Sequence, residues 1–453
     1  MEIDLSSKGI KSFIWWYHFD DDVKVIESLV SEGVLSVEIW FGNHTKMQHN
    51  IKPLLFQPEF ILKEENLLLL PLEYDEKIRD YYEKFVEGYS RKPYSKGQSH
   101  HELWHLFYLY ARYFFTQLKV KKIEVVLFSV LPHHGIDMLL YGMAKVMGIR
   151  TILTMQSLVP NRFWYIEDIE DFGYFSQIPI REDKAYKIPN SFKKELFYMK
   201  NISYKKPSCF VLAYKDFERG FLGKASKKIR LSGIVSKFTA CRFYYRYRMK
   251  AFVKSVDLKR KYIYFPLQLQ PELTTSTLGG KYVDQLLALE HLAKIIPEDW
   301  FIYIKENPKQ MFDQRDRCFF KRLERIPSVR YLSMKYNTYE LIESSQFVSV
   351  VTGTAGWEAI SGGKNVLVFG QAWYKTLPGV FSFHSKMNIE EILAYKIDHT
   401  LLEREYSKLI GKSYEGIIDK AYYKSDITYK SQKNIEHLRF FLKDVLHSKC
   451  KIK

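Results

Sequence analysis

The feature that most constrains the fold is an alternation of short apolar runs with amphipathic segments, which occurs twice along the chain. In the first half, predicted strands at 12–17, 34–40, 123–130 and 151–155 alternate with predicted helices at 21–32 and 134–147. In the second half, predicted strands at 262–266, 300–305, 329–332, 347–351 and 365–369 alternate with predicted helices at 282–296, 338–344 and 357–361. Continuous apolar strands separated by helices are typical of parallel sheets that are covered on both faces. The sequence therefore predicts an α/β fold with two Rossmann-type parallel-sheet domains.

The chain has 453 residues, and domains usually contain about 100–200 residues, so more than one domain is expected. We predict an N-terminal Rossmann-like domain over 1–183 and a basic, aromatic-rich connecting segment over 184–260. A C-terminal Rossmann-like domain is predicted over 261–420, followed by an amphipathic helix and a basic tail over 421–453.

Positive charge is concentrated in the connecting segment. The formal net charge is +17, and residues 184–261 contain 22 Lys and Arg against 4 Asp and Glu. Basic and aromatic residues alternate in CRFYYRYRMK, at 241–250. Such a patch indicates an anionic partner, and the choices are a membrane surface, a phosphorylated lipid-linked acceptor or nucleic acid; the alternative is a solvated face with no partner. We favour an anionic membrane surface, and no nucleic-acid-binding motif supports nucleic acid.

The cysteines and apolar runs predict a soluble cytoplasmic protein, which the basic segment would place at the inner face of the plasma membrane. Cys209, Cys241, Cys318 and Cys450 form no CxxC pair, and their spacing suits neither zinc nor a disulfide framework, so a reducing compartment is expected. The N-terminal apolar run is too short for a signal peptide. No run approaches the roughly 20 apolar residues that cross a bilayer.

The stretch VTGTAGWEAISGGKNVLVFG predicts an anion site. Thr352, Gly353, Thr354 and Gly356 follow a predicted strand and include no bulky side chain. Ligands of open α/β sheets bind beyond the carboxyl ends of the strands, and the N–H groups that open the next helix favour phosphate. The spacing fits neither an NTPase loop nor a dinucleotide loop. Glu358, expected in the first turn of the helix, can accept from ribose hydroxyls; the alternative is a plain β–α turn.

Two more polar loops follow predicted strands of the same half. PLQLQPELTTSTLGG contains Gln270 and Glu272, and KENPKQ contains Lys305, Glu306 and Asn307. Three such loops at one edge of one sheet favour a ligand pocket over three unrelated turns.

The zinc-binding sequence motif H-E-x-x-H is matched by His101-Glu102-Leu103-Trp104-His105. No third ligand follows on a plausible helix, and the surrounding residues predict a helix with an aromatic packing face that begins after Ser99. We therefore interpret this stretch as structural.

Two segments of the second half resemble the capsular polysaccharide biosynthesis proteins, which are bacterial glycosyltransferases related to the Kdo transferases of capsule assembly. They read FPLQLQPELTTSTLGGKYVDQLLALEHLAKIIPEDWFIYIKENPKQ and VTGTAGWEAISGGKNVLVFGQAWYKTLPGVF. LFSVLPHHGIDMLLYGMAKVMGIRTI in the first half is similar too. The resemblance implies a GT-B fold, with two Rossmann domains facing each other across a cleft. It implies a nucleotide-sugar, often CMP-linked, in the C-terminal domain and the acceptor in the N-terminal domain.

The resemblance also implies roles for single residues of the donor site. Thr352 and Thr354 would contact the donor phosphate, and Glu358 would face the nucleotide ribose. Gln270 and Glu272 would line the sugar side.

Lys305 and Glu306 would border the phosphate loop. Many relatives have histidine where this chain has Asn307. Asparagine can donate a hydrogen bond but carries no charge, and a charged donor usually stabilises a departing phosphate better. Asn307 therefore keeps open the alternative of a chain that binds but does not catalyse.

Transfer also requires placement of the acceptor hydroxyl, and a base can assist. His133, His134 and Asp137 follow the predicted strand at 123–130 and are candidate catalytic residues, as is the acidic run at 167–171. The alternatives are a helix cap and a solvated face. No Asp-x-Asp pair is placed for Mg²⁺ in the donor half, so we expect a metal-independent enzyme with no cofactor besides its nucleotide-sugar.

The function that these expectations favour is a glycosyltransferase of surface polysaccharide assembly. It would transfer a sugar, such as Kdo from a CMP donor, to a lipid-linked or glycan acceptor. The alternatives are a polyol-phosphate transferase of the teichoic-acid type and a non-catalytic protein that binds sugar-nucleotide or polysaccharide.

Overall fold

The structure is a computed structural model, and its residues form two compact units. Unit 1 contains residues 1–183 and 409–453, and unit 2 contains residues 184–408. The described residues are 9–448 except 48, 52–53, 55–60, 62–65, 91–97, 194–240, 247–252, 254–255, 271, 311–314 and 424–428. Most of the basic segment lies outside the described residues, so the membrane surface predicted over 184–261 stays a prediction.

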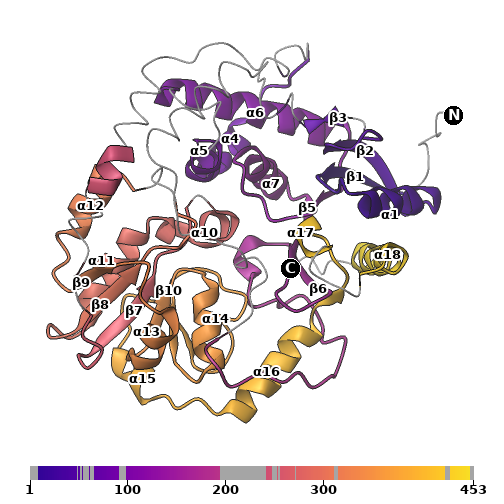
Figure 1. Cartoon of the computed structure of the whole chain (residues 1–453). Helices are drawn as coiled ribbons and strands as arrows, with labels where there is room; N and C mark the ends of the chain where they lie inside the picture. Colours follow the sequence, from indigo (N-terminus) through magenta and orange to yellow (C-terminus); the bar gives the residue numbers. More distant parts are fainter. Residues whose placement is uncertain are drawn as a thin grey trace. The chain divides into compact units, whose positions relative to one another are not determined.

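Unit 1 contains a seven-stranded sheet in the order β13-β6-β5-β4-β1-β2-β3 (Figure 1). Strands β1 to β5 are parallel to one another, whereas β6 is antiparallel to β5 and β13 is antiparallel to β6. Strand β1 lies between β2 and β4, so the winding of the chain reverses there. The strands are β1 Ile10–Trp15, β2 Leu35–Gly42, β3 His49–Asn50, β4 Val125–Phe128, β5 Arg150–Gln156, β6 Arg162–Ile166 and β13 Tyr414–Glu415.

Helices cover this sheet because each has one apolar face. Helix α1 packs on β2, and α7 packs on β5 and contacts α4, α5 and α6. Phe13, Trp15 and Phe41 of the strands and Phe114 of α6 pack together in the core. The helices are α1 Asp20–Ser31, α4 Leu72–Ile78, α5 Tyr82–Ser90, α6 His100–Val120, α7 Ile136–Val146, α17 Lys420–Tyr423 and α18 Ser431–His447.

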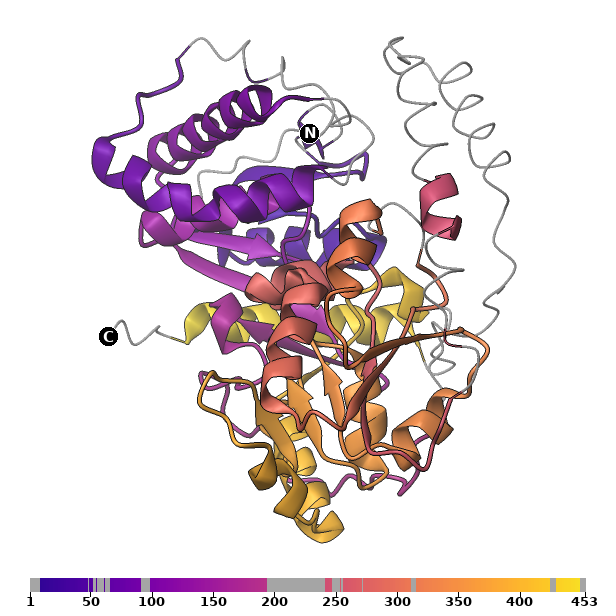
Figure 2. The same cartoon turned by 90° about the vertical axis from the view of Figure 1, so that its left-hand side faces the viewer.

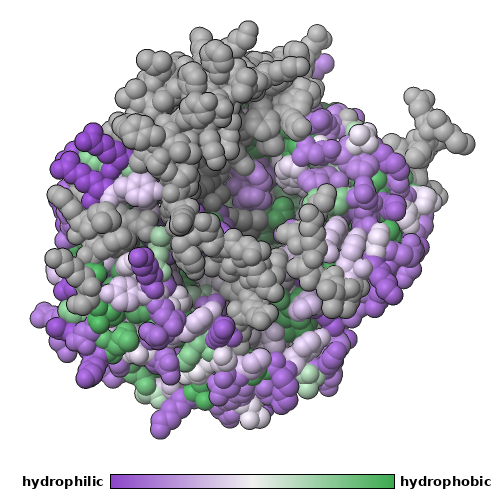
Figure 3. Space-filling view, viewed as in Figure 1, coloured by the Kyte–Doolittle hydropathy of each residue, from purple (hydrophilic) through white to green (hydrophobic). Residues whose placement is uncertain are grey.

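The C-terminal segment of the chain belongs to unit 1. Strand β13 extends the sheet, and α18 lies beside α1 (Figure 1). Asp21 of α1 accepts hydrogen bonds from Tyr429, Ser431 and Asn434. The outer surface of α1 and α18 is mostly hydrophilic (Figure 3), so their apolar faces are turned inward, as the amphipathic pattern at 434–446 predicts.

Unit 2 contains a six-stranded, fully parallel sheet in the order β12-β11-β10-β7-β8-β9. The winding reverses between β7 and β10, which gives the 3-2-1-4-5-6 order of a dinucleotide-type sheet. Figure 2 shows the helices that flank these strands. The strands are β7 Tyr262–Pro266, β8 Phe301–Lys305, β9 Val329–Leu332, β10 Val348–Val350, β11 Val366–Val368 and β12 Val380–Ser382. The helices are α10 Leu273–Leu278, η5 Gly280–Val283, α11 Gln285–Ile295, α12 Arg317–Leu323, α13 Thr338–Ser344, α14 Thr354–Ser361, α15 Ile389–Ala394 and α16 His399–Gly411.

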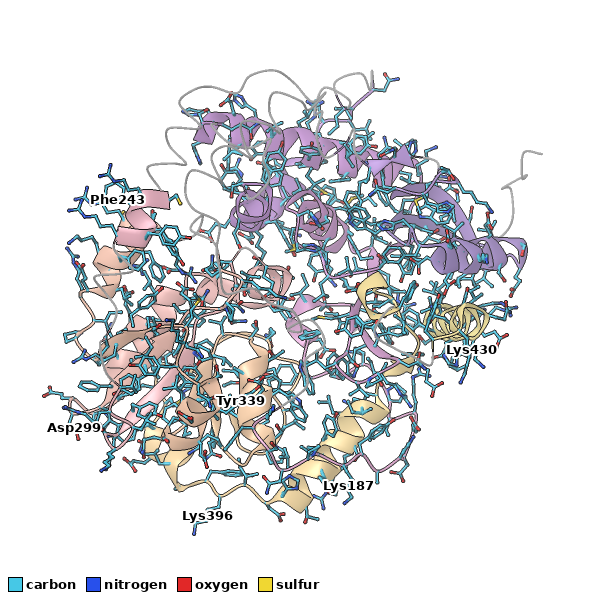
Figure 4. All side chains as sticks on the ribbon, viewed as in Figure 1. Lys187, Phe243, Asp299, Tyr339, Lys396 and Lys430 are labelled. Carbon is cyan, nitrogen blue, oxygen red and sulfur yellow. The ribbon has the colours of Figure 1, made fainter. Side chains whose placement is uncertain are left out.

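The described part of the connecting segment contributes to unit 2. Residues 241–246 are helical, and the fully buried Tyr244 joins the core beside Phe320, whereas Arg242 and Arg246 are exposed. Lys187 lies beside α16 (Figure 4), with its Nζ 2.8 Å from Glu403 Oε2. The aromatic side chain of Tyr244 in the basic stretch therefore packs in the core of unit 2.

Cys241 is disulfide-bonded, which corrects the expectation that the cysteines form no disulfide. Pairing depends on proximity in the folded chain, and spacing along the sequence does not report it.

The fold class predicted from the sequence is confirmed, because both units are α/β and are built on Rossmann-type sheets. Some local predictions were wrong: the polar loop after β7 contains the helix α10, and the next long helix begins at Gln285 and not at 282. The cleft between facing domains and the predicted domain limits stay predictions. Among the described residues, no helix combines the length and apolar character needed to cross a bilayer.

Candidate functional site

The switch point of unit 2 is built from the loops that follow β7 and β10, and the buried side chain of Gln268 joins them. Its Nε2 donates to Thr352 Oγ1 at 2.9 Å, and its Oε1 accepts from the Thr352 N–H at 2.8 Å. Gln285 holds Gln268 in turn, through two hydrogen bonds to its backbone. Thr352 is 7 % exposed, so it supports the loop, and only its hydroxyl proton remains for the phosphate contact that was predicted.

The part of the loop that reaches the surface is Gly353–Ala355, which is half-buried and opens helix α14. Gly353 is the N-cap residue, so the first N–H groups of the helix have no partner within it. Gly356 lies against Tyr374: a Cβ at this position would lie 2.2 Å from the Tyr374 hydroxyl, which donates to the Gly353 carbonyl. Glycine is therefore required for the close approach that shapes this loop.

Glu358 is the fifth residue of α14, so the prediction that it lies in the first turn was wrong. It is 7 % exposed and lies near Lys305, at the end of β8. The Lys305 ammonium donates to the Tyr336 carbonyl at 2.8 Å and to the Thr338 hydroxyl. Burial lowers the pKa of Lys305 to about 8, and the Glu358 carboxylate opposes that decrease. These two charges therefore stabilise each other beneath the loop, and the predicted ribose contact of Glu358 stays a prediction.

Glu306 forms a buried ion pair with Arg315. The Arg315 Nε lies 2.8 Å from Glu306 Oε1, and both side chains are 0 % exposed. Tyr331 donates to the same carboxylate oxygen at 2.9 Å. Arg315 also donates to Gln270 Oε1 at 2.7 Å and to the Gln268 carbonyl at 3.3 Å. The ion pair thus stabilises the loop after β7 through the hydrogen bonds of Arg315. From the sequence, Glu306 was predicted to border the phosphate loop.

Gln270 is part of the same internal network. Its Oε1 accepts from Arg315, its Nε2 donates to the Val283 carbonyl, and its N–H donates to Gln310 Oε1 at 2.8 Å. The prediction that its side chain lines the sugar site therefore gains no support, because its amide already has these partners in the protein.

Glu272 and Asn307 keep groups that a ligand can use. Glu272 caps α10 and is half-buried; burial raises the pKa of its carboxyl, which the Thr274 hydroxyl and Lys309 oppose. The Asn307 Oδ1 accepts from the Lys309 N–H at 2.9 Å, an arrangement that shapes the turn and directs the amide nitrogen away from it. Both residues adjoin the switch point, because their loops follow β7 and β8.

Unit 1 brings its predicted catalytic residues together at its own switch point. Asp137, which is fully buried in the first turn of α7, accepts from the backbone N–H groups of His133 and His134 at 3.0 and 2.6 Å. The His134 Nδ1 donates to Asp137 Oδ2 at 3.2 Å. Burial alone would raise the pKa of Asp137, but its hydrogen bond to His134 and the charges of both histidines lower it well below its usual range. Asp137 therefore fixes His134 as a tautomer whose Nε2 can accept a proton.

The three side chains also offer ligand atoms within 4.8 Å of one another, as a metal site would. Their Nδ1 atoms are engaged, however: the His133 Nδ1 donates to the Leu131 carbonyl at 2.8 Å, and the His134 Nδ1 is bound to Asp137. This pattern favours an oriented acid–imidazole pair.

The other acidic candidates have structural partners. Arg150 binds Glu167 at 2.6 Å, Lys145 pairs with Asp168, and Asp171 accepts from the Ser176 backbone and hydroxyl. The acidic run at 167–171 therefore stabilises a turn.

The zinc-like motif is structural, as interpreted from the sequence. Ser99 accepts from the Glu102 N–H, and the Glu102 carboxylate accepts from the Ser99 N–H, which is a capping box at the start of α6.

Sequence reasoning missed Arg315 and Tyr374. Arg315 lies in a polar stretch, and Tyr374 lies within the second of the two resembling segments but was given no role. No local pattern marks either residue, because their partners lie in other loops.

No curated protein sequence matches the chain. A Kdo 2,7-transferase, KpsC of Thermosulfurimonas dismutans, is similar at 13 % identity and a TM-score of 0.31, over 80 % of this chain and 96 % of that one. Anabaena HepE, solved with UDP and glucose, is similar at 10 % identity and a TM-score of 0.28, over 96 % and 100 % of the two chains. The UDP-GlcNAc 2-epimerase of Methanocaldococcus jannaschii is similar at 10 % identity and a TM-score of 0.23, over 96 % and 99 %.

The comparison with protein families concerns the second unit. Residues 224–386 match the family described as capsule polysaccharide biosynthesis protein. This range contains both switch-point loops, the Glu306–Arg315 pair and helix α14. Through residues 224–386, the chain is similar to the family of capsule polysaccharide biosynthesis proteins.

Proposed function

We propose that the protein is a glycosyltransferase of capsular polysaccharide synthesis that binds a nucleotide-sugar at the switch point of unit 2. The observation that carries the proposal is the half-buried loop Gly353–Ala355, which opens α14 at the point where the winding of a parallel sheet reverses. A helix start there attracts a phosphate, and a switch point is where ligands of such sheets bind.

In the transfer reaction, the loop Gly353–Ala355 would stabilise charge on the leaving phosphate. Cleavage of the sugar–phosphate bond increases the negative charge on the nucleotide phosphate. Backbone N–H groups of Gly353–Ala355, the hydroxyl of Thr354 and the amide nitrogen of Asn307 can share that charge without a metal. The sugar lies on the side of Glu272, whose carboxyl accepts or donates hydrogen bonds according to its protonation.

The base of the reaction is His134 in this proposal. Its Nε2 accepts the proton of the acceptor hydroxyl as the oxygen bonds to the anomeric carbon, while Asp137 stabilises the imidazolium that forms. The buried carboxylate supports the assignment because its hydrogen bond orients the ring.

The proposed substrates are those that the resemblance to capsular polysaccharide biosynthesis proteins implies. The donor is CMP-linked and carries an acidic sugar such as Kdo, and the acceptor is a glycan or a lipid-linked glycan at the cytoplasmic face of the membrane. The basic segment at 184–261 would hold the protein at anionic lipids.

Asn307 favours a second candidate, a protein that binds a sugar-nucleotide but does not transfer the sugar. Its uncharged amide stabilises a leaving phosphate less than an imidazolium would. The polyol-phosphate transferase of the teichoic-acid type has no comparable observation in its favour.

Thermal unfolding with CMP-, CDP-, UDP- and GDP-linked sugars tests the donor site. A ligand that binds only the folded state raises the melting temperature, and Gly356→Ala should reduce the increase. Equal melting temperatures with and without every donor would contradict the proposal.

Turnover of the donor that binds separates the two candidates. We expect His134→Asn to abolish transfer and to leave donor binding intact, and Asn307→His to increase the rate. His101→Asn, at an exposed position of α6, is the matched control. If the wild-type protein binds the donor but shows no transfer or hydrolysis, the binding protein is the correct reading.

A further inference from the structure

We propose that the switch point of unit 1 is a saccharide site in which the indole ring of Trp16 is the platform for a neutral sugar. The proposal rests on the proposed function, because the sugar would be the acceptor whose hydroxyl His134 deprotonates. It specifies the acceptor class as an uncharged pyranose.

The first observation is the backbone directly after β1. Trp16 has φ +71° and Tyr17 has φ +40°, so two bulky residues in sequence adopt the left-handed conformation. Side chains of this size rarely do so, and the conformation persists only where the surroundings impose it. Here the Trp16 N–H donates to the Phe41 carbonyl at 3.0 Å, and the Trp40 Nε1 donates to the Trp16 carbonyl at 3.2 Å. Two residues of strand β2 therefore bind the backbone N–H and the carbonyl of Trp16.

The second observation is where the ring lies. The Trp16 ring is 6.0 Å from the His134 ring and 4.7 Å from the His18 ring, so the strained turn brings it beside the oriented imidazole. Trp16 is only partly buried, although its neighbour Trp15 is 1 % exposed. A large ring retained at the surface next to a candidate base has area left for a ligand.

The third observation is the indole N–H of Trp16, which has no hydrogen-bond partner among the described residues although its nitrogen is shielded from solvent. Tryptophan N–H groups usually find a partner when they are buried. A ligand hydroxyl is a suitable acceptor.

The charges around the turn select the class of ligand. Asp137 holds His134, and Asp20 and Asp21 open helix α1 shortly after the turn. Carboxylates repel phosphates and uronates but accept hydrogen bonds from sugar hydroxyls. The loop after β8 in unit 2 carries the exposed Lys309 instead. The two switch points are therefore suited to different substrates, an anionic donor in unit 2 and a neutral acceptor in unit 1.

Fluorine NMR of the full chain labelled with fluorotryptophan tests this assignment. The Trp16→Phe variant identifies the Trp16 line by its absence, and Trp16→Tyr does so if the first variant fails to fold. The probes are glucose, galactose and N-acetylglucosamine at millimolar concentration, each also as its methyl glycoside, with glucuronic and galacturonic acids as the charged counterparts. We expect at least one neutral sugar to shift the Trp16 line and the matched uronic acid to bind at least tenfold more weakly.

Two controls separate this site from the fold and from the donor. Trp15→Phe changes the adjacent buried ring, and it should lower the melting temperature but leave the sugar titration unchanged. Donor binding is measured separately, by thermal shift, so its failure would refute the proposed function and leave the saccharide site standing. The inference is overturned if no neutral sugar moves the Trp16 line, if the uronic acids bind more tightly, or if Trp15→Phe abolishes the shift of the Trp16 line.

Discussion

Replacing Glu306 by glutamine should destabilise unit 2 far more than a surface substitution would. The change leaves the Arg315 guanidinium, which is 0 % exposed, without its counter-charge. Breaking a buried ion pair by removing one partner costs about 3–5 kcal/mol, because the remaining charge is uncompensated. Glutamine retains an oxygen that can accept from Arg315 and Tyr331, so we expect a loss at the lower end, about 3 kcal/mol.

Removing both charges should have a different result. In Glu306→Met/Arg315→Met no charge is left buried, and replacing a whole buried pair by apolar residues is often neutral, within about 1 kcal/mol. Donor binding should nevertheless be weaker in the double variant than in the wild-type protein. The hydrogen bonds from Arg315 to Gln270 and to the Gln268 carbonyl are lost with the arginine, and these hold the loop after β7.

Hydrogen exchange measured by mass spectrometry suits a chain of two units, because peptides from β7 and β8 report on unit 2 alone. The double variant should protect these peptides as the wild-type protein does, and Glu306→Gln should not. Thermal shift with the donor then shows whether binding recovers with stability. The reasoning is wrong if Glu306→Gln costs less than about 1 kcal/mol, or if the double variant regains donor binding together with stability.

Three further predictions concern other parts of the chain. Burial raises the pKa of Asp22 to about 7, above its value in the unfolded chain, so the folded protein loses stability as pH rises between the two pKa values. Asp22→Asn should therefore stabilise the protein by up to about 4 kcal/mol above about pH 7 and have no effect below about pH 4. The measurement is the pH dependence of urea unfolding. Asn434→Ala removes three buried hydrogen bonds between α18, Asp21 and the Ile417 backbone and should cost about 2–3 kcal/mol in the same assay, whereas the exposed Gln432→Ala should cost less than about 0.5 kcal/mol. Gly356→Ala should displace Tyr374 and weaken donor binding by about tenfold or more, measured by titration calorimetry, with unchanged far-ultraviolet circular dichroism.

The candidate site could be predicted in outline. The glycine- and hydroxyl-rich run Thr352–Gly356 follows an apolar strand, and strand ends of a parallel sheet are ligand sites whatever the rest of the chain does. The grouping of His133, His134 and Asp137 could also be expected, because a loop and the first turn of the next helix bring residues this close in sequence together. Groupings of residues that are close in the sequence can therefore be predicted from the sequence.

Which polar side chain faces a ligand was decided only by tertiary contacts. Gln268 and Thr352 are 84 positions apart and yet hold each other, and Gln270 and Glu306 turn to Arg315 instead of to the surface. In the sequence all of them are polar residues in polar loops, and nothing local distinguishes a loop support from a ligand contact.

The sequence by itself determined the class of fold, because apolar runs of strand length separated by amphipathic helices can bury their surface only as parallel sheets covered on both faces. The tertiary structure decided the strand order, the return of residues 409–453 to unit 1 and the left-handed turn at Trp16. Each of these depends on contacts between distant segments, and the free energy of such contacts is a property of the packed chain that no local pattern of residues contains.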